Sequence, residues 1–534
     1  MFDVLILNGK IVDGTGSPWF YGDIGIRGEE IATIGKLSHE SADQVIDARG
    51  AIVSPGFIDM HTHSDLVILA QPFIKAKIMQ GITTDLLGQD GIAAAPLPSK
   101  YVEIWKRNLA GLDGTPPIDW DWSDVGSYLQ KIQGKRPSYN LAFVVPHGNI
   151  RMTVLGIDNR PATDTEIAKM QEILIQSLEQ GAAGLSTGLI YPPCCFAEMK
   201  ELEALCQVIA QYGAPLVIHQ RSEGDEIVES MQELIAIMSR TGAHLHLSHL
   251  KNCGKDNWYK TEQVLNLIDE AREHGVEITF DQYPYTAGST MLSAILPPWA
   301  QDGGSDKMLE RLRDPHMRNR MILEMASGLK GWDSMSKWAG WSGIYVTSVE
   351  SEINRSAVGK SIAEIGKMRD TEDFPNVALD LIAEERNGVG MIDFVMNEES
   401  VKKIMAHPAG TIGSDGLLGG EPHPRAYGTF PRVLGKYVRE EHVLPLEDMI
   451  RRMTSQPARI IGLQDRGIVR EGLKADLVIF NKDTINDTAT YASPRQYPTG
   501  IDYVLVNGSI IVEYDRRYDL PAGRVLRRRY AKRT

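Results

Sequence analysis

The chain lacks the features that mark several large classes of protein. Its 534 residues include only 4 cysteines, whose spacing fits neither a zinc finger nor a disulfide scaffold. No window approaches the roughly 18 consecutive apolar residues of a membrane span. The amino-terminal segment has neither a basic leader nor a small-residue cleavage site. We therefore expect a soluble, cytoplasmic protein with reduced thiols and no membrane partner.

Positive charge is in the minority, with 56 lysines and arginines against 70 aspartates and glutamates. The formal net charge is −14, which argues against a nucleic-acid partner. One basic cluster, Arg524–Arg529, stands near the carboxyl end, and we expect it to be a solvated tail. The length exceeds one usual domain, so two or more folding units are expected.

Short β-like runs occupy both ends of the chain. Near the amino end, runs such as Val4–Leu7 and Glu30–Ile34 alternate with Asn-Gly, Asp-Gly and Arg-Gly pairs, which favour tight turns. The same pattern returns in Ala475–Phe480 and Ile501–Val506. Because a few strands are only marginally stable alone, we predict that residues 1–55 and 455–520 join in one small β-sandwich domain.

The middle of the chain, residues 56–454, alternates apolar strands with amphipathic helices such as Asp164–Gln180 and Thr261–His274. This alternation is typical of parallel β/α units. Eight candidate strands end in the segments 59–63, 84–90, 141–147, 184–187, 216–219, 245–249, 277–281 and 411–415. Eight units predict an α/β fold of the (β/α)8 or TIM-barrel type.

The connection between candidate strands seven and eight is too long for one β/α unit. Its residues 288–394 carry helical runs of their own, Met308–Arg313 and Met317–Met325. They also include Trp299, Trp332, Trp338 and Trp341, which we expect to form a separate core. We predict an inserted lid or subdomain at the active-site end of the barrel.

Histidines and aspartates follow the candidate strands, at the end where barrels of this type place their chemistry. They are His61 and His63 after strand one, Asp90 after two, His147 after three, His219 after five, His249 after six and Asp415 after eight. The His-Thr-His pair alone favours an ordinary polar strand end, but the convergence of the set predicts a metal centre. Nitrogen and oxygen ligands without thiolate suit Zn²⁺, and Mn²⁺, Fe²⁺, Co²⁺ and Ni²⁺ stay open.

Within this set the residues suggest different roles. A metal lowers the pKa of a bound water to about 7, and a neighbouring carboxylate can carry that water's proton to the leaving group. Asp415 fits this acid/base role, with a helix N-cap as its alternative. The alternative for Asp90 is a turn residue in an Asp-Gly pair. For His147 we favour a hydrogen-bonded structural role.

Longer motifs resemble a known family. Gly56-Phe-Ile-Asp-Met-His-Thr-His63, the two later histidines and Gly413-Ser-Asp-Gly416 together resemble the amidohydrolase superfamily. The segments 184–193, 219–225, 248–251, 281–285 and 422–435 resemble more narrowly the N-acyl-D-amino-acid deacylases, or D-aminoacylases. The resemblance covers essentially the whole chain. It implies a barrel with a small β-domain and metal-dependent hydrolysis of the amide bond of N-acyl-D-amino acids.

The resemblance also implies roles for single residues. His219 and His249 would hold a tightly bound zinc ion, and His61 and His63 a second, weaker or empty site. Asp415 would be the catalytic acid/base. The residues implied to bind the substrate, a small N-acyl amino acid, are Lys251, Tyr283 and Arg425, with Tyr191 and Ser289 nearby. Whether the chain forms a homo-oligomer stays open.

One departure from the family concerns the segment after strand two. The D-aminoacylases typically carry a metal-ligating cysteine there, in Gly-Asn-Cys-Gly, whereas this chain reads Gly88-Gln-Asp-Gly91. A carboxylate can also ligate or bridge zinc, and a harder oxygen ligand shifts affinity away from thiolate-preferring metals. Asp90 is therefore a candidate ligand, and one or two bound ions both stay open.

Two other functions stay open from the sequence. A cyclic-amide hydrolase of the hydantoinase or dihydroorotase type, or a dipeptidase, can use the same scaffold. Lys251 and the segment Pro422–Arg425 argue against them. A non-catalytic binding relative would be marked by lost metal ligands, and only the aspartate at position 90 points that way.

Overall fold

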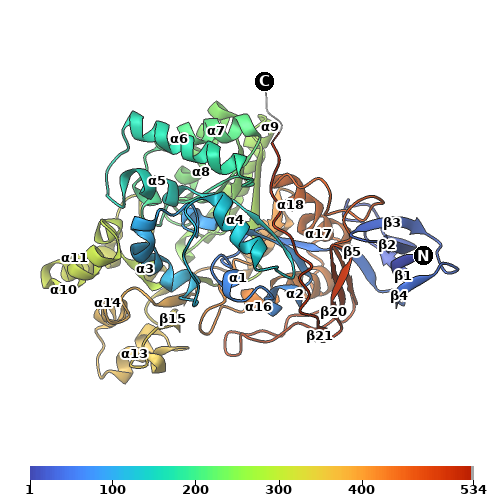
Figure 1. Cartoon of the computed structure of the whole chain (residues 1–534). Coiled ribbons are helices and arrows are strands. Elements are labelled where there is room, and N and C mark those ends of the chain that lie inside the picture. Colours follow the sequence, from blue (N-terminus) through green and yellow to red (C-terminus); the bar gives the residue numbers. More distant parts are fainter. Residues whose placement is uncertain (531–534) are drawn as a thin grey trace.

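The computed structural model describes residues 1–530 (Figure 1). A barrel with its helices occupies the middle, a sheet built from both chain ends lies on one side, and an inserted segment projects on the other. Within the described residues, no helix is both long and apolar enough to cross a membrane.

The eight predicted strands are present and parallel. They are β6 (Phe57–Asp59), β7 (Ile82–Leu87), β8 and β9 (Asn140–Phe143 and Val145–Pro146), β10 (Leu185–Gly188), β11 (Pro215–His219), β12 (His244–Leu247), β13 (Ile278–Gln282) and β17 (Gly410–Ile412). Nearly all their residues are buried. Strands of parallel sheets are covered on both faces, so they read as continuous apolar runs rather than alternating ones.

These strands form two sheets that meet at both edges. One sheet has the order β6-β7-β8 and the other β9-β10-β11-β12-β13-β17. Only Val144 separates β8 from β9, so one segment passes from the first sheet to the second. At the other edge the backbone N–H of Met60 donates to the carbonyl of Ile412 at 3.3 Å, and that of Asp415 donates to the carbonyl of His61 at 2.8 Å. These bonds close the ring of the predicted barrel.

Helices surround the ring. They are α1 (Val67–Ala70), α2 (Lys75–Ile78), α3 (Val102–Asp113), α4 (Val125–Gly134), α5 (His147–Leu155), α6 (Asp164–Glu179), α7 (Met199–Tyr212), α8 (Ile227–Thr241), α9 (Thr261–Glu273), α15 (Glu398–Ala406), α16 (Arg425–Arg432), α17 (Leu446–Met453) and α18 (Ser455–Ile460). Local sequence sets their ends. Thr163 and Glu166 form a capping box at the start of α6, and Gly213 (φ 60°) ends α7 in the left-handed region.

The inserted segment, residues 288–394, has a hydrophobic core of its own. It contains the antiparallel sheet β14-β16-β15 (Gly288–Met291, Gly390–Asp393 and Ile344–Ser348) and the helices α10 (Ser305–Arg313), α11 (Pro315–Ser327), α12 (Met335–Ala339), α13 (Ile362–Met368) and α14 (Phe374–Glu384). Trp299, Trp332 and Trp341 pack against that core. Trp338 does not: it packs against Cys253 and Tyr283 of the barrel, which corrects our expectation for this tryptophan.

Strands from both chain ends join in one nine-stranded sheet. The strands are β1 (Phe2–Ile11), β2 (Phe20–Arg27), β3 (Glu30–Gly35), β4 (Ala42–Asp47), β5 (Ile52–Pro55), β18 (Leu477–Phe480), β19 (Ile501–Val506), β20 (Ser509–Glu513) and β21 (Arg516–Arg517). The antiparallel pair β5–β18 connects the two ends, with Val53 opposite Ile479. The first residues of the predicted range 455–520 are helix α18, so the carboxyl-terminal strands begin only at Leu477.

The basic carboxyl-terminal segment is not a solvated tail, and that prediction is wrong. The N–H of Leu141 in β8 donates to the carbonyl of Arg524 at 2.9 Å, and the N–H of Leu526 donates back to Leu141 at 2.8 Å. The side chain of Arg528 donates to the backbone carbonyls of Ala183 and Gly213. The segment therefore lies as an added strand-like piece along the barrel.

A substitution at Gly523 tests whether the carboxyl-terminal segment packs against the barrel in this way. A Cβ atom on Gly523 would lie 2.0 Å from the backbone carbonyl oxygen of Tyr139, so we expect Gly523→Ala to destabilise the protein by about 1–3 kcal/mol. Gly134→Ala is the matched control, because a Cβ there meets no atom within 4 Å. Urea unfolding measures both. Equal midpoints for the two variants would contradict the docking of this segment.

Candidate active site

Six buried side chains meet at the carboxyl ends of the barrel strands. They are His61 and His63 after β6, Asp90 in a short 3₁₀ turn after β7, His219 at the end of β11, His249 after β12 and Asp415 after β17. Each is at most 5% exposed. The structure thus brings together all six of the residues that the sequence suggested as metal ligands.

Asp90 lies at the centre of this cluster. Its Oδ2 is 3.5 Å from His63 Nε2, and its Oδ1 is 3.6 Å from His61 Nε2 and 3.7 Å from His249 Nε2. His249 Nε2 is in turn 3.0 Å from His219 Nδ1. Asp90 therefore faces the histidines of β6 on one side and those of β11 and β12 on the other.

Asp415 occupies a second position against the same histidines. One of its oxygens, Oδ1, lies 3.3 Å from His63 Nε2 and 3.6 Å from His61 Nε2. The other, Oδ2, forms an ion pair with Arg425 Nη1 at 2.9 Å. Asp415 thus faces the histidines of the candidate metal site (the metal cluster) with one oxygen and the guanidinium of Arg425 with the other.

The donor atoms fit a divalent cation. Three groups have ligand atoms within 4.8 Å of one another: His61, His63 and Asp90; Asp90, His219 and His249; and His61, His249 and Asp415. Among residues 1–530, no hydrogen-bond partner exists for the buried atoms His61 Nε2, His219 Nε2 and Asp90 Oδ1. A buried polar atom without a partner costs about 1–3 kcal/mol, and cations held by the first two of these groups would give all three atoms a partner.

The cluster shifts the proton affinity of its members. Burial opposes the charged imidazolium, yet the carboxylates of Asp90 and Asp415 raise the pKa of His61 well above its ordinary value and that of His63 to about 9. Burial also opposes the charge on Asp90, but the imidazoles hold its pKa well below the usual range. His219 behaves differently, since burial lowers its pKa to about 4. Its neutral imidazole is the form that ligates a metal.

Three of the six residues have an unusual backbone. Asp90 (φ 56°), His249 (φ 34°) and Asp415 (φ 48°) lie in the left-handed region, which side chains other than glycine rarely adopt. The N–H of His249 is held by Asp281 Oδ1 at 2.9 Å. Such strain gathers at functional sites, because the surrounding structure must enforce it.

Beside the cluster lie the residues suggested to bind substrate. Lys251 Nζ donates to Glu223 Oε1 and to His249 Nδ1, both at 2.7 Å. The guanidinium of Arg425 lies 4.5 Å from the centre of the Tyr283 ring. The Tyr283 hydroxyl has no hydrogen-bond partner in the described part of the chain. Two fixed cations and one free phenol therefore face the cluster.

The other two suggested substrate residues are turned toward the inserted segment. Tyr191 donates or accepts a hydrogen bond with Thr290 Oγ1 at 2.8 Å, and its ring lies 5.4 Å from that of His219. The hydroxyl of Ser289 donates to the carbonyl of Met391 within the sheet of the insertion. Its backbone carbonyl, not its hydroxyl, accepts the bond from Arg425 at 2.8 Å. His147 lies outside the cluster, hydrogen-bonded to Thr187 and Glu201.

Sequence reasoning missed three buried carboxylates of the site. Glu223 lies 3.1 Å from His249 Nδ1, Asp281 lies 3.1 Å from His246 Nε2, and Asp113 lies 3.9 Å from His63 Nδ1. Asp281 ends candidate strand seven, and this place at a strand end is the signal that could have identified it. Glu223 stands four residues after His219 in a segment already recognised as a motif. Asp113 is the last residue of α3, and no local signal in the sequence marks it.

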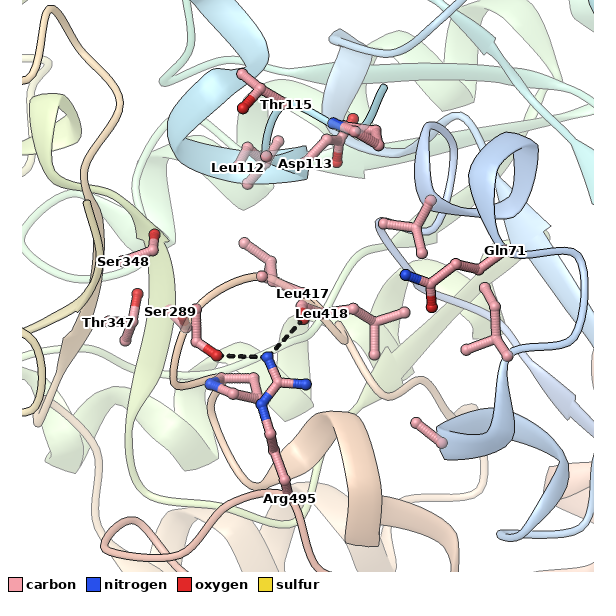
Figure 2. Close-up of a pocket in the computed structure, with 18 of the residues that line it drawn as sticks. Gln71, Leu112, Asp113, Thr115, Ser289, Thr347, Ser348, Leu417, Leu418 and Arg495 are labelled. Atoms are coloured by element: carbon pink, nitrogen blue, oxygen red, sulfur yellow. Dashed lines mark hydrogen bonds between the residues drawn. The ribbon is translucent and has the colours of Figure 1, made fainter. Parts of the chain in front are cut away.

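Two cavities open beside these residues. The narrower one covers the metal cluster and is lined by Tyr191, Lys251, Tyr283 and Arg425, with Trp332 and Trp338 of the insertion. The larger one, about 900 Å³, shares Leu112 and Ser289 with it (Figure 2). The two cavities therefore adjoin at Leu112 and Ser289.

A model of the amidohydrolase family matches residues 44–512, which include the whole barrel and the parts of the β-domain that adjoin it. The chain belongs to the amidohydrolase family. It is 36% identical to N-acyl-D-glutamate deacylase of Alcaligenes xylosoxydans xylosoxydans, over 98% of this chain and 96% of the relative. It is 33% identical to D-aminoacylase of the same organism, over 99% and 98% of the two chains.

Solved structures agree with this family. N-acyl-D-glutamate deacylase of Bordetella bronchiseptica, complexed with zinc and a phosphonate mimic of the tetrahedral intermediate, is 35% identical, with a TM-score of 0.84 over 99% of this chain and 100% of that one. L-hydantoinase of Arthrobacter aurescens is 15% identical with a TM-score of 0.53. That second likeness shows a shared fold alone.

In this amidohydrolase the loop that carries Asp90 is held by the neighbouring strand. Ser186 in β10 accepts a bond from the N–H of Gly91 at 3.2 Å and donates to the carbonyl of Gly88. A Cβ on Gly88 would lie 2.0 Å from the carbonyl oxygen of Val144, so the loop requires glycine there. One hydroxyl therefore clamps both ends of the turn that presents Asp90.

Removing this clamp is expected to loosen the metal centre. In Ser186→Ala two buried backbone groups lose their partner, and we expect Zn²⁺ affinity to fall by roughly tenfold or more, as for other groups that orient ligands. Competition with a chelating dye measures the affinity directly. Ser239→Ala, which removes an exposed hydroxyl bonded to Ile235, is the control. Unchanged affinity in Ser186→Ala would show that the clamp does not position Asp90.

Proposed function

We propose that the protein is a metal-dependent deacylase that hydrolyses the amide bond of N-acyl-D-amino acids. The observation that carries this proposal is the position of the candidate metal ligands. These buried histidines and aspartates lie directly against two cationic side chains, Lys251 and Arg425. Cations beside a metal site suit a substrate with a free carboxylate. Relatives that span nearly the whole chain are named D-aminoacylase, N-acyl-D-glutamate deacylase and N-acyl-D-aspartate deacylase.

Zinc is the metal we assign to the site. His219, His249 and Asp90 form one candidate set of ligands, and His61, His63 and Asp90 form the other, with Asp90 shared. Related structures contain zinc or copper, and one is described by its binuclear metal centre. A bound ion would supply a water of lowered pKa and polarise the scissile carbonyl.

Asp415 is assigned the proton transfer. Burial opposes its charge, but Arg425 and the imidazole of His61 hold the pKa of Asp415 below its usual range, so it stays a carboxylate. With Oδ1 against His61 and His63 it can accept the proton of the attacking water. Transfer of that proton to the amide nitrogen completes cleavage and releases a carboxylate and a free D-amino acid.

The cationic side chains are assigned to the substrate's α-carboxylate. Burial opposes the charge on Lys251, but Glu223 raises its pKa, so the ammonium persists. Arg425 presents a planar guanidinium, which suits bidentate recognition of a carboxylate. The free hydroxyl of Tyr283, between the two, is placed to donate to the oxyanion that develops on the carbonyl.

The alternatives are less well supported. The hydantoinases share the fold at 15–16% identity, and nothing in that likeness bears on the reaction. A non-catalytic relative would be expected to lose members of the cluster, whereas this chain retains a full set of buried donors with Asp90 in the family's cysteine position.

A substrate screen tests the activity. We expect the zinc-loaded protein to hydrolyse N-acetyl-D-amino acids, with L enantiomers and cyclic amides hydrolysed at least about 100-fold more slowly. Removal of metal with a chelator should abolish activity, and added Zn²⁺ should restore it. Metal removal should also lower the midpoint of unfolding, because a ligand that binds only the folded state stabilises that state. Hydrolysis of cyclic amides but not of linear ones would overturn the proposal.

A substitution tests the acid/base assignment. Because general acid–base catalysis contributes roughly 10²–10⁴-fold, Asp415→Asn should lower kcat by that order while KM changes less. Metal content of the same preparation, measured by mass spectrometry, separates lost proton transfer from lost metal. Asp370→Asn is a matched control, since Asp370 is exposed and has a similar backbone φ of 55°. Near-normal turnover of metal-loaded Asp415→Asn would show that another group moves the proton.

A further inference from the structure

The larger cavity lies at the mouth of the active site. The end of α3, with Leu112, Asp113 and Thr115, forms one wall, and Thr347 and Ser348 of the insertion form another (Figure 2). Arg495, from the loop before β19, lies across its floor in this view. At about 900 Å³ the cavity is of the size of a small-molecule site. An acetyl group would leave nearly all of it to water.

The metal cluster has two distinct sides. On one side Lys251 Nζ lies 2.7 Å from His249 Nδ1. On the other side Asp113 Oδ1 lies 3.9 Å from His63 Nδ1, where the large cavity begins. The acyl and amino-acid parts of an amide extend from its carbonyl in opposite directions. If the α-carboxylate is at Lys251, the acyl group therefore extends past His63 and Leu112 into this cavity.

The cavity carries an excess of positive charge, although the chain as a whole has a net charge of −14. Lys75, Arg495 and Arg517 line it, against the exposed acid Glu350. Arg517 is already paired with Asp519 at 2.7 Å, so the excess rests on Lys75 and Arg495. Arg495 is bonded only to neutral groups within residues 1–530: the hydroxyl of Tyr427 at 3.2 Å and the carbonyls of Leu418 and Gly420. These bonds aim the guanidinium and leave it without a carboxylate.

The one buried acid on the wall does not cancel this charge. Asp113 lies beside the metal-ligand candidate His63, 3.9 Å from its Nδ1, and forms no ion pair with Arg495 in the described residues. Lys75 Nζ lies 4.2 Å from the centre of the Tyr497 ring, and that ring lies 5.7 Å from the ring of Tyr427, whose hydroxyl accepts a bond from Arg495. An anion that reached this wall would meet two cations.

We propose that this cavity binds the acyl part of the substrate and that this part is dicarboxylic: a chain of several atoms that ends in a free carboxylate at Arg495 and Lys75. The inference rests on the proposed deacylase function and names its substrate class. Water adds to the amide carbonyl, the C–N bond breaks and the amine takes the proton. The products are a dicarboxylate and a D-amino acid.

A matched series of acyl groups tests the proposal on the intact protein. Succinyl, glutaryl and adipoyl derivatives of one D-amino acid are compared with butanoyl, pentanoyl and hexanoyl derivatives, and with the acetyl derivative. We expect the kcat/KM of at least one dicarboxylic substrate to exceed that of the uncharged substrate of equal length by about tenfold or more. Arg495→Gln should reduce this ratio severalfold, and Lys75→Gln provides a second variant if the first is unstable. Arg470→Gln, a change of an exposed arginine outside the cavity, should leave the ratio unchanged.

The outcomes separate this inference from the function on which it rests. Hydrolysis of acetyl and uncharged acyl substrates without any advantage for the dicarboxylic ones overturns the inference and leaves the deacylase intact. No hydrolysis of any N-acyl-D-amino acid overturns the proposed function itself. A preference for N-acetyl-D-glutamate over N-acetyl-D-glutamine that Arg495→Gln removes would assign the cavity to the amino-acid side chain, which also overturns the inference.

Discussion

A buried carboxylate, Asp59, connects the two strands on which the whole site depends. Its Oδ1 accepts from the backbone N–H of Ser414 at 2.7 Å and of His61 at 3.3 Å, and its Oδ2 accepts from Lys77 Nζ at 2.7 Å. Removing one partner of such a buried pair typically costs about 3–5 kcal/mol. Because Asp59 ends the first barrel strand and Ser414 follows the last, the bond that closes the barrel also sets His61 beside Asp415. The precision of the active site is thus a consequence of ring closure.

Charge balance is the second constraint. Each cation beside the metal cluster already has a buried carboxylate, Lys251 with Glu223 and Arg425 with Asp415. A substrate carboxylate therefore enters as an additional anion, and it binds best once a divalent cation has offset the buried carboxylates of the cluster. This coupling makes metal binding and substrate binding interdependent even though different residues carry them.

Most of the fold could be predicted from the sequence, because buried parallel strands appear as apolar runs that end in polar residues. The same rule located the ligand candidates, since the carboxyl ends of parallel strands meet at one edge. What it missed depends on distant contacts. The partner of Glu223 is Lys251, 28 residues away, and the docking of Arg524–Leu526 depends on an edge of β8 that no local pattern reveals. The short strands of the insertion were missed because each pairs only with others of the same insertion.

Asp90 shows how one departure from a family pattern can alter a site without dismantling it. A thiolate offers a single ligand atom, whereas the carboxylate of Asp90 presents Oδ2 to His63 and Oδ1 to His61 and His249. Oδ1 therefore lies between the two groups of histidines, and Oδ2 adds a second donor atom on the side of His63. An oxygen donor is also harder than sulfur, which favours metals other than the most thiophilic. Ser186 clamps the turn in which the backbone of Asp90 adopts a left-handed conformation. The backbone therefore enforces the orientation of the Asp90 carboxylate.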